Sequence, residues 1–228
     1  MAKIATAKKN ILIIRRDNWQ KDIALYRSLL KYFKKQKHTI IFDGPVGGSI
    51  YYSKTLEWTY KWLPDSMQKI NKKIIHFLYA LFFPDSFFNV YNKKNDSIES
   101  RCLALKKAIL KLGTNKEIVI FSRSSGGRIA SLIADELSIK KIICLGYPFK
   151  HPEKEIEPDR FLHLRNLKTP FLIIQGTNDE YGGKEIQEKY SFSPTIELFF
   201  VDTNHDFKVS GEDWKKVLSK ISGFIDPV

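Results

Sequence analysis

The sequence predicts an α/β protein whose sheet is mostly parallel and carries helices on both faces. Short, wholly apolar runs alternate with longer segments whose apolar residues recur at helical spacing. The apolar runs are typical of strands buried on both sides, because helices cover both faces of a parallel sheet. With 228 residues, 43% of them hydrophobic and 28% charged, the chain fits one domain over residues 1–228.

The first three expected elements are a strand, a helix and a second strand. Residues 11–14 are four consecutive aliphatic side chains, which predict a short buried strand. Residues 22–36 place apolar side chains on one helical face, and residues 39–42 form the second apolar run. This run is followed by Asp43-Gly44-Pro45, a sequence typical of a turn.

A segment rich in aromatic side chains, from about residue 49 to 96, interrupts the alternation. We expect a helical insertion here, and three interpretations stay open. Its helices could pack on the core, form a lid or pocket wall over a site, or touch a membrane surface through residues 74–88. In the third interpretation, the lysine pairs at 72–73 and 93–94 flank the contact.

The alternation resumes after the insertion. Strands are expected at 118–121, 142–145, 171–174 and 196–201, and helices at 100–112, at 126–137 and around Trp214, Val217, Leu218, Ile221 and Phe224. Ligands of such sheets bind at the carboxyl ends of the strands. Reactive residues that directly follow a strand are therefore the candidates for a functional site.

A serine follows the strand at 118–121. The sequence there reads Ser122-Arg123-Ser124-Ser125-Gly126-Gly127-Arg128. A sharp turn from a strand into a helix lifts a serine hydroxyl above the sheet, and small neighbours let the helix pack closely. Ser124 is therefore a candidate nucleophile. In the alternative interpretation, its side chain only caps the helix.

Two further strand ends carry an acid and a histidine. Asp179 ends a Gln-Gly-x-x-Asp sequence after the strand at 171–174, and His205 lies in a polar loop after the strand at 196–201. A histidine can accept the proton of a serine, and an acid can fix the tautomer of that histidine. The alternatives make Asp179 a turn carboxylate, or Asp202 the acid. The histidines at 38, 76, 151 and 163 are less well placed.

These residues resemble the α/β-hydrolase superfamily. Ser124 and its neighbours are similar to the Gly-Arg-Ser-x-Gly-Gly-Arg turn of small dienelactone-hydrolase-like members, with Ser122 in place of the first glycine. The order Ser124, Asp179, His205 is the order that this fold requires. The resemblance implies an α/β-hydrolase fold and a serine esterase in which these three residues are catalytic.

The resemblance also implies two backbone N–H groups that bind the oxyanion. One is expected at Ser125, and the second after the first strand, at Asp17 or its neighbour Arg16. Family members often have His-Gly at this point, whereas this chain has Arg15 and Arg16. An arginine that faces the pocket would favour an anionic substrate.

The amino-acid composition limits the kinds of partner and cofactor that we expect. The net charge of +13 comes from lysines scattered along the chain, which favours a solvated surface, and no nucleic-acid partner is expected. The only cysteines are Cys102 and Cys144; they suggest neither a disulfide framework nor a metal site, and no cofactor is expected. The chain has no signal-peptide or membrane-spanning pattern, so we expect a cytoplasmic protein. The oligomeric state is not predicted.

The predicted activity is therefore hydrolysis of a small-molecule ester or related acyl bond through an acyl-serine intermediate. Two alternatives stay open. The substitution at Ser122 and the missing His-Gly favour a catalytically inactive protein that keeps the fold for binding. An acyltransferase would use the same three residues, because a fold does not decide which acceptor takes the acyl group.

Overall fold

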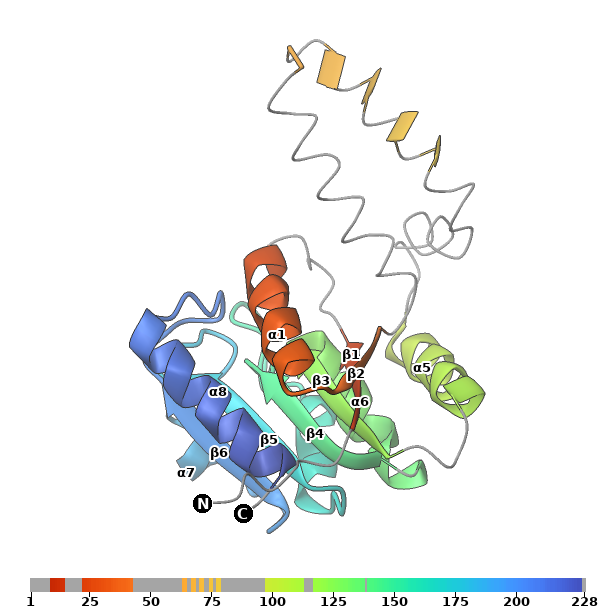
Figure 1. Cartoon of the computed structure of the whole chain (residues 1–228). Helices are drawn as coiled ribbons and strands as arrows, with labels where there is room; N and C mark the ends of the chain where they lie inside the picture. The colour runs from red at the N-terminus through yellow and green to blue at the C-terminus, as the bar shows by residue number, and fades with distance from the viewer. Residues whose placement is uncertain are drawn as a thin grey trace, which may run out of the picture. The chain divides into compact units, whose positions relative to one another are not determined.

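The computed structural model describes residues 9–14, 22–42, 97–112, 117–137 and 139–226, together with short pieces between residues 63 and 78 (Figure 1). The chain forms two compact units, Met1–Ile41 with Cys102–Val228, and Phe42–Arg101. The described elements are β1 (Asn10–Ile14), α1 (Ile23–Lys35), β2 (Thr39–Phe42), α5 (Ile98–Leu112), β3 (Ile118–Arg123), α6 (Ser125–Ile133), η2 (Ala134–Glu136), β4 (Ile139–Leu145), η3 (Pro158–Arg160), η4 (Leu162–Arg165), β5 (Phe171–Gly176), α7 (Ile186–Lys189), β6 (Ile196–Val201) and α8 (Gly211–Ile225).

The expected parallel sheet is confirmed. The described strands form one six-stranded sheet in the order β2-β1-β3-β4-β5-β6, and the four pairs from β1 to β6 are parallel. The chain moves outward from β1 to β2, and then crosses to β3 on the other side of β1. Carboxyl ends of neighbouring strands therefore lie along one edge of the sheet, where α/β proteins bind ligands.

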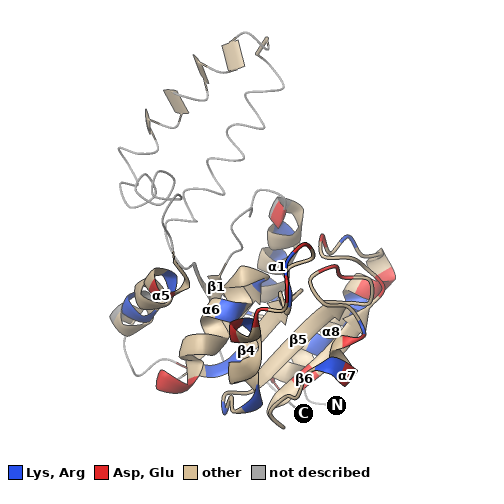
Figure 2. Ribbon diagram, turned by 180° about the vertical axis from the view of Figure 1, so that it is seen from behind, with Lys and Arg blue, Asp and Glu red and all other residues tan. Residues whose placement is uncertain are grey.

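Helices cover both faces of this sheet. Figure 1 shows α1 and α8 in front of the strands, and α6 lies on the opposite side in Figure 2. On the first face, the ring of Phe33 meets that of Phe121 edge-on, with 5.8 Å between the centroids. On the second face, Ile129 and Ile133 of α6 join the core formed by β3 and β4. The predicted two-sided burial of the strands is thus confirmed.

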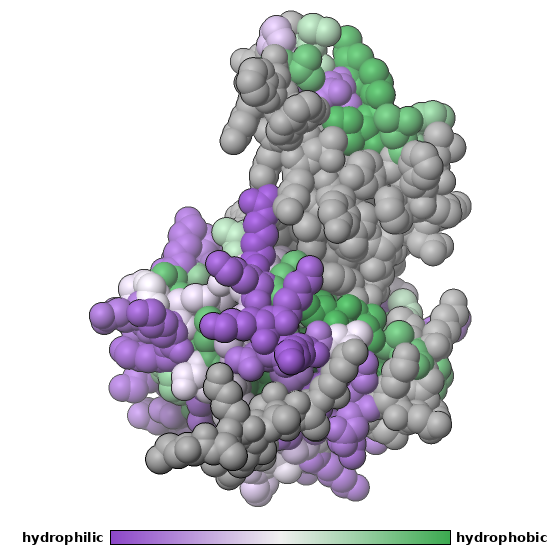
Figure 3. Space-filling model, viewed as in Figure 1, coloured by the Kyte–Doolittle hydropathy of each residue, from purple (hydrophilic) through white to green (hydrophobic). Residues whose placement is uncertain are grey.

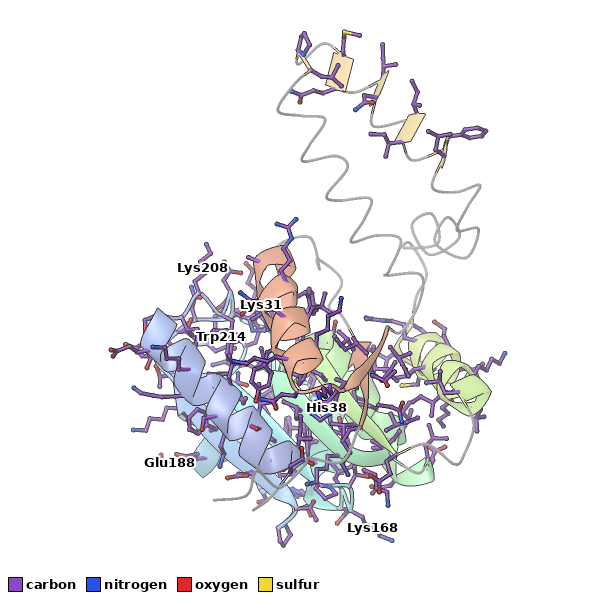
Figure 4. All side chains as sticks on the ribbon, in the orientation of Figure 1. Lys31, His38, Lys168, Glu188, Lys208 and Trp214 are labelled. Atoms are coloured by element: carbon purple, nitrogen blue, oxygen red, sulfur yellow. The ribbon has the colours of Figure 1, made fainter. Side chains whose placement is uncertain are left out.

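The two helices of the first face are also joined by polar contacts. The Tyr32 hydroxyl donates to the Leu218 carbonyl at 3.1 Å. Trp214, which is labelled in Figure 4, donates through Nε1 to Ser28 Oγ at 2.8 Å. Helix α8 begins with a capping serine, since Ser210 Oγ accepts from the Asp213 N–H. Capping satisfies a backbone donor that has no partner within the helix.

Several predicted boundaries differ from the structure; β4, for example, begins at Ile139 and not at residue 142. The strands predicted to end at residues 121 and 174 continue to Arg123 and Gly176, because their polar ends are buried and bonded. Ser122 Oγ, for example, donates to the Ile143 carbonyl at 2.8 Å. The helix predicted over 126–137 changes at Ala134 into the short 3₁₀ turn η2.

Most of the aromatic insertion lies outside the described residues. The pieces that the structure describes between residues 67 and 78 are helical, with Ile75 buried and Phe77 exposed. Its suggested function as a lid, core-packing helices or membrane contact stays a prediction.

In Figure 3 hydrophilic residues predominate on the unit that contains the sheet, whereas the described pieces between residues 67 and 78 expose mostly hydrophobic side chains. In Figure 2, both acidic and basic residues occur along the ribbon, and several form pairs. Lys150 Nζ lies 3.0 Å from the Glu185 carboxylate, and Lys216 Nζ lies 2.9 Å from that of Asp213. Within the part of the chain that the structure describes, no helix has the length and apolar character needed to cross a bilayer.

A cluster of partly buried polar side chains links α6 to the 3₁₀ turns η3 and η4. Ser131 Oγ lies 2.8 Å from His163 Nε2, and the Arg128 guanidinium lies 2.5 Å from the Asp159 carboxylate. Burial lowers the pKa of His163 from its ordinary value of 6.5 to about 4, and the charge of Arg128 acts in the same direction. The Tyr147 hydroxyl completes the group by donating to the Arg160 carbonyl at 2.7 Å.

Close packing of α6 on β4 requires Gly127. A Cβ at this position would lie 2.3 Å from Cys144 Sγ. We expect Gly127→Ala to lower the free energy of unfolding by about 1–3 kcal/mol, because the core must shift to admit the methyl group. Urea unfolding measures this. Adding Cys144→Ala to Gly127→Ala should recover part of this loss, since it removes the sulfur that the new methyl group would meet.

Gly223 in α8 offers the matched control, since a Cβ there meets nothing within 4 Å. Gly223→Ala should be neutral or stabilise the protein by up to about 1 kcal/mol, because alanine is the better helix former. Equal losses in the two variants would contradict the packing argument.

The partly buried His163 predicts a loss of stability in mild acid. Between pH 6.5 and about 4 the unfolded chain binds a proton on this side chain and the folded chain does not. The free energy of unfolding therefore falls as the pH drops through this window, by up to about 3 kcal/mol from this residue. In His163→Gln, urea unfolding at several pH values should show a shallower dependence. Parallel curves for both proteins would refute this.

Candidate active site

Three residues that are far apart in the sequence meet at the carboxyl edge of the sheet. Ser124 Oγ lies 2.9 Å from His205 Nε2, and His205 Nδ1 lies 2.9 and 3.0 Å from the two carboxylate oxygens of Asp179. All three side chains are buried, and Ser124 keeps 8% of its surface exposed. The structure thus joins the predicted serine, histidine and acid in one hydrogen-bonded chain.

Ser124 occupies a strained turn between β3 and α6. Its backbone has φ 50° and ψ −122°, a region that non-glycine residues rarely adopt and that costs of order 1–3 kcal/mol. Two backbone bonds hold the turn: Ser124 N–H donates to the Leu145 carbonyl at 3.1 Å, and Gly127 N–H donates to the Ser124 carbonyl at 2.8 Å. The side chain forms no capping bond to α6, so the alternative interpretation of Ser124 as a helix cap is wrong.

The carboxylate of Asp179 is held from two sides. Gln175 Nε2 donates to Asp179 Oδ2 at 2.9 Å, and the Tyr181 N–H donates to Oδ1 at 2.8 Å. Gln175 is itself fully buried and bonded to the main chain of Tyr147 and Gly182. These donors fix the orientation of the acid toward His205.

The side chain of Asp202, the alternative acid, bonds to residues other than His205. It is exposed and accepts from Asn178 Nδ2 at 3.2 Å and from Thr177 Oγ1 at 3.4 Å. Neither contact involves His205, so Asp179 is the acid that the fold brings to the histidine.

The loop that carries His205 packs against the end of β5. A Cβ on Gly176 would lie 2.4 Å from the Thr203 carbonyl oxygen, so only glycine allows this approach. The Asn178 N–H donates to the same carbonyl at 3.1 Å. The ring of Tyr181 lies over the imidazole of His205, with 4.2 Å between the centroids. The histidine is thereby confined on its backbone and on its ring.

Of the residues predicted to supply the oxyanion donors, Ser125 lies among the described residues and Arg16 and Asp17 do not. Ser125 is the first residue of α6 and directly follows the serine of the turn. Amide groups at a helix N-terminus attract negative charge, so the prediction for Ser125 is retained. Asp17, Arg15 and Arg16 lie outside the described residues, and the second donor stays a prediction.

The described residues contain no group of three or more histidine, cysteine or acidic side chains that could hold a metal ion. Both cysteines are free thiols, and burial raises the pKa of Cys144 to about 12. A thiol with this pKa is protonated at neutral pH and is a poor nucleophile. Ser124 stays the candidate nucleophile predicted from the sequence.

Sequence reasoning missed three residues that support the site: Gln175, Tyr181 and Arg123. Gln175 is the first residue of the Gln-Gly-x-x-Asp motif that identified Asp179. Nothing in the motif indicated that its side chain bonds to Asp179. Arg123 stood in the motif around Ser124, but nothing there indicated its contacts with Leu145 and His205. Tyr181 carried no signal in the sequence, although its N–H bonds to the nearby Asp179.

The comparisons with known proteins agree with this architecture. The profile of the alpha/beta hydrolase domain family matches residues 54–226, well over half of the chain. A search of curated proteins gave no match. The family profile therefore carries the assignment.

Several solved structures are similar in fold across nearly the whole chain. An alpha-beta serine hydrolase homologue from Coxiella burnetii has a TM-score of 0.59 at 12% identity, over 95% of this chain and 85% of that one. The Pyrococcus furiosus esterase Pf2001 has a TM-score of 0.58 at 15% identity, over 97% and 83%. A structure from work on the metagenome-derived lipolytic enzymes LipS and LipT gives 0.57 at 12% identity, over 96% and 94%.

At such identities these structures establish the fold only, and the resemblance to dienelactone-hydrolase-like members stays a prediction. The family match covers β3, β5 and β6, whose carboxyl ends lead to Ser124, Asp179 and His205. The predicted superfamily is confirmed: this chain belongs to the alpha/beta hydrolase domain family.

Proposed function

We propose that the protein is a serine hydrolase of the esterase type, which cleaves a small-molecule ester or related acyl bond with Ser124 as the nucleophile. The observation that carries the proposal is the continuous chain from Ser124 through His205 to Asp179, which starts on a strained turn at the ligand-binding edge of the sheet. A serine hydroxyl is a weak nucleophile on its own, and an adjacent base activates it.

In the first half of the proposed reaction, His205 Nε2 accepts the proton of Ser124 while Oγ bonds to the acyl carbon. The carbonyl oxygen gains the negative charge, and backbone N–H groups including that of Ser125 stabilise it. Asp179 holds His205 in the tautomer that leaves Nε2 free to accept and stabilises the imidazolium. The bond to the leaving alkoxide then breaks, and His205 returns the proton to it.

In the second half, water replaces the alcohol. His205 removes a proton from the water, whose oxygen bonds to the acyl carbon, and the acid is released as Ser124 recovers its proton. If another hydroxyl compound takes the place of water, the same residues transfer the acyl group. The acyltransferase alternative therefore differs only in the acceptor.

The solved structures of similar fold give this proposal some support, because two of them are described as an esterase and as lipolytic enzymes. The cytoplasmic location and the absence of a cofactor and of a nucleic-acid partner belong to the same proposal.

Reaction with a fluorophosphonate probe tests the nucleophile. We expect the probe to modify Ser124 in the wild-type protein, located by mass spectrometry, because the probe phosphonylates an activated serine. Ser124→Ala should abolish this adduct, and His205→Ala should slow its formation by about 10³-fold or more.

Ser131 provides the matched control, because its hydroxyl also lies beside a histidine, at 2.8 Å from His163 Nε2. That histidine has no carboxylate partner on Nδ1, which is buried without a hydrogen bond among the described residues. Ser131→Ala should leave labelling of Ser124 unchanged. A folded wild-type protein that is not labelled would favour the binding role instead.

A pair of aspartate variants tests the assignment of the acid. Asp179→Asn should slow labelling by about 10³–10⁴-fold, because the amide no longer holds the required histidine tautomer. Asp202→Asn should stay within about twofold of wild type, since Asp202 is exposed and does not contact His205. The rate of labelling at fixed probe concentration measures both. A larger effect of Asp202→Asn would reverse the assignment.

A further inference from the structure

A buried charge lies directly beneath the proposed site. The side chain of Arg123, the last residue of β3, is fully buried. Its guanidinium donates through Nη1 to the Leu145 carbonyl at 2.9 Å and through Nη2 to the His205 carbonyl. Its Cζ atom lies over the ring of Phe207, 5.5 Å from the centroid.

The counter-ion of this arginine comes from the start of α1. Asp22 is 2% exposed, and its carboxylate lies 3.9 Å from Arg123 Nε. Asp22 occupies the N-cap position of α1, yet its side chain makes no capping bond. Its side chain is therefore not used for the usual function of an aspartate at this position, and the carboxylate balances the buried guanidinium.

Such a pair needs an explanation other than stability. Removing two charges from water costs several kcal/mol for each ion, and an apolar pair of similar volume is often as stable or more so. Arg123 is surrounded by strands that elsewhere bury aliphatic side chains. The geometry of its two donor groups supplies the explanation.

The Nη1 and Nη2 groups of Arg123 contact the main chain on both sides of the proposed site, the side of Ser124 and the side of His205. The Leu145 carbonyl that accepts from Arg123 also accepts from the Ser124 N–H at 3.1 Å, so this arm supports the strained turn. The other arm holds the main chain of His205. One planar group thus joins the backbone that positions the nucleophile to the backbone that positions the base.

Gly146, which has φ +62°, lies against the Arg123 guanidinium. A Cβ there would lie 2.6 Å from Arg123 Nη1, 3.3 Å from Asp179 Oδ2 and 3.4 Å from His205 Nδ1. Arg123 Nη1, Asp179 Oδ2 and His205 Nδ1 therefore all lie around the position that a side chain at residue 146 would occupy. A Cβ at position 146 would clash with the guanidinium, and the positive φ would strain any other residue there.

We propose that Arg123 is a positioning residue, which sets the distance between Ser124 Oγ and His205 Nε2 by fixing the main chain on both sides. The inference rests on the proposed function. The role requires a forked, planar donor, because two carbonyls in different directions must be bonded at once. Lysine retains the charge but concentrates its donors at one nitrogen, so it does not replace the fork.

The test compares Arg123→Lys and Arg123→Met with wild type by three measurements. Thermal unfolding establishes that each variant is folded. Proton NMR follows the far-downfield resonance of the imidazole N–H bonded to Asp179, which reports the geometry of His205 without requiring activity. Fluorophosphonate labelling reports the reactivity of Ser124. We expect both variants to lose or shift the resonance and to label at least about tenfold more slowly.

Arg128 provides the matched control. It is a mostly buried arginine five residues away that also pairs with a carboxylate, but its partner is Asp159. Arg128→Lys and Arg128→Met should keep the resonance and label within about twofold of wild type. Equal losses in both pairs would mean that the Arg123 effect is only general destabilisation, which overturns the proposal.

The outcomes separate this inference from the proposed function. A folded Arg123→Lys with the wild-type resonance and labelling rate overturns the inference and leaves Ser124 as nucleophile. If wild type shows the resonance but is not labelled, the esterase proposal fails, and the resonance in the variants alone decides the role of Arg123. If Arg123→Met does not fold, Arg123→Lys, which keeps the charge beside Asp22, gives the decision.

Discussion

The left-handed turn at Ser124 is the constraint on which the arrangement of the site depends. A non-glycine residue in this conformation is stable only where the surrounding structure holds it. Here the carbonyl of Leu145 holds the incoming side of the turn, and the N–H of Gly127 holds the outgoing side. Gly127 can do so only because α6 lies against Cys144 without a side chain between them. The same close contact aims the Ser124 hydroxyl away from the sheet, toward His205.

The parallel sheet supplies the other two groups. Strands β5 and β6 pair in register from Phe171 with Ile196 to Gly176 with Val201, so their following loops start side by side. The close approach of Gly176 to the Thr203 carbonyl then brings Asp179 within hydrogen-bonding distance of His205. Because parallel strands end at one edge, residues 81 and 26 positions from His205 in the sequence become its neighbours in space.

The sequence predicted the strands, their parallel arrangement and the three residues that meet, because apolar runs and strand-end positions are local features. It missed contacts that depend on tertiary structure. Arg123 looked like a loop residue, since hydropathy gives no reason for a charge to extend a buried strand. Gln175 and Tyr181 likewise gain their function only when Asp179 lies between them. The choice between Asp179 and Asp202 also needed three-dimensional geometry. Asp17 lies outside the described residues.

His205 is held at both ends by groups of different chemistry. Asp179 bonds its ring and the tilted ring of Tyr181 lies against it, whereas the Arg123 guanidinium bonds its main-chain carbonyl. Fixing only the ring would leave the loop able to carry the whole histidine away from Ser124. Fixing only the main chain would leave the ring able to rotate about its side-chain bonds. Proton transfer requires heavy atoms within about 2.6–3.2 Å, so both restraints are needed to hold the observed 2.9 Å contact. Under the proposed function, positioning His205 for proton transfer explains the cost in stability of the buried Arg123 charge.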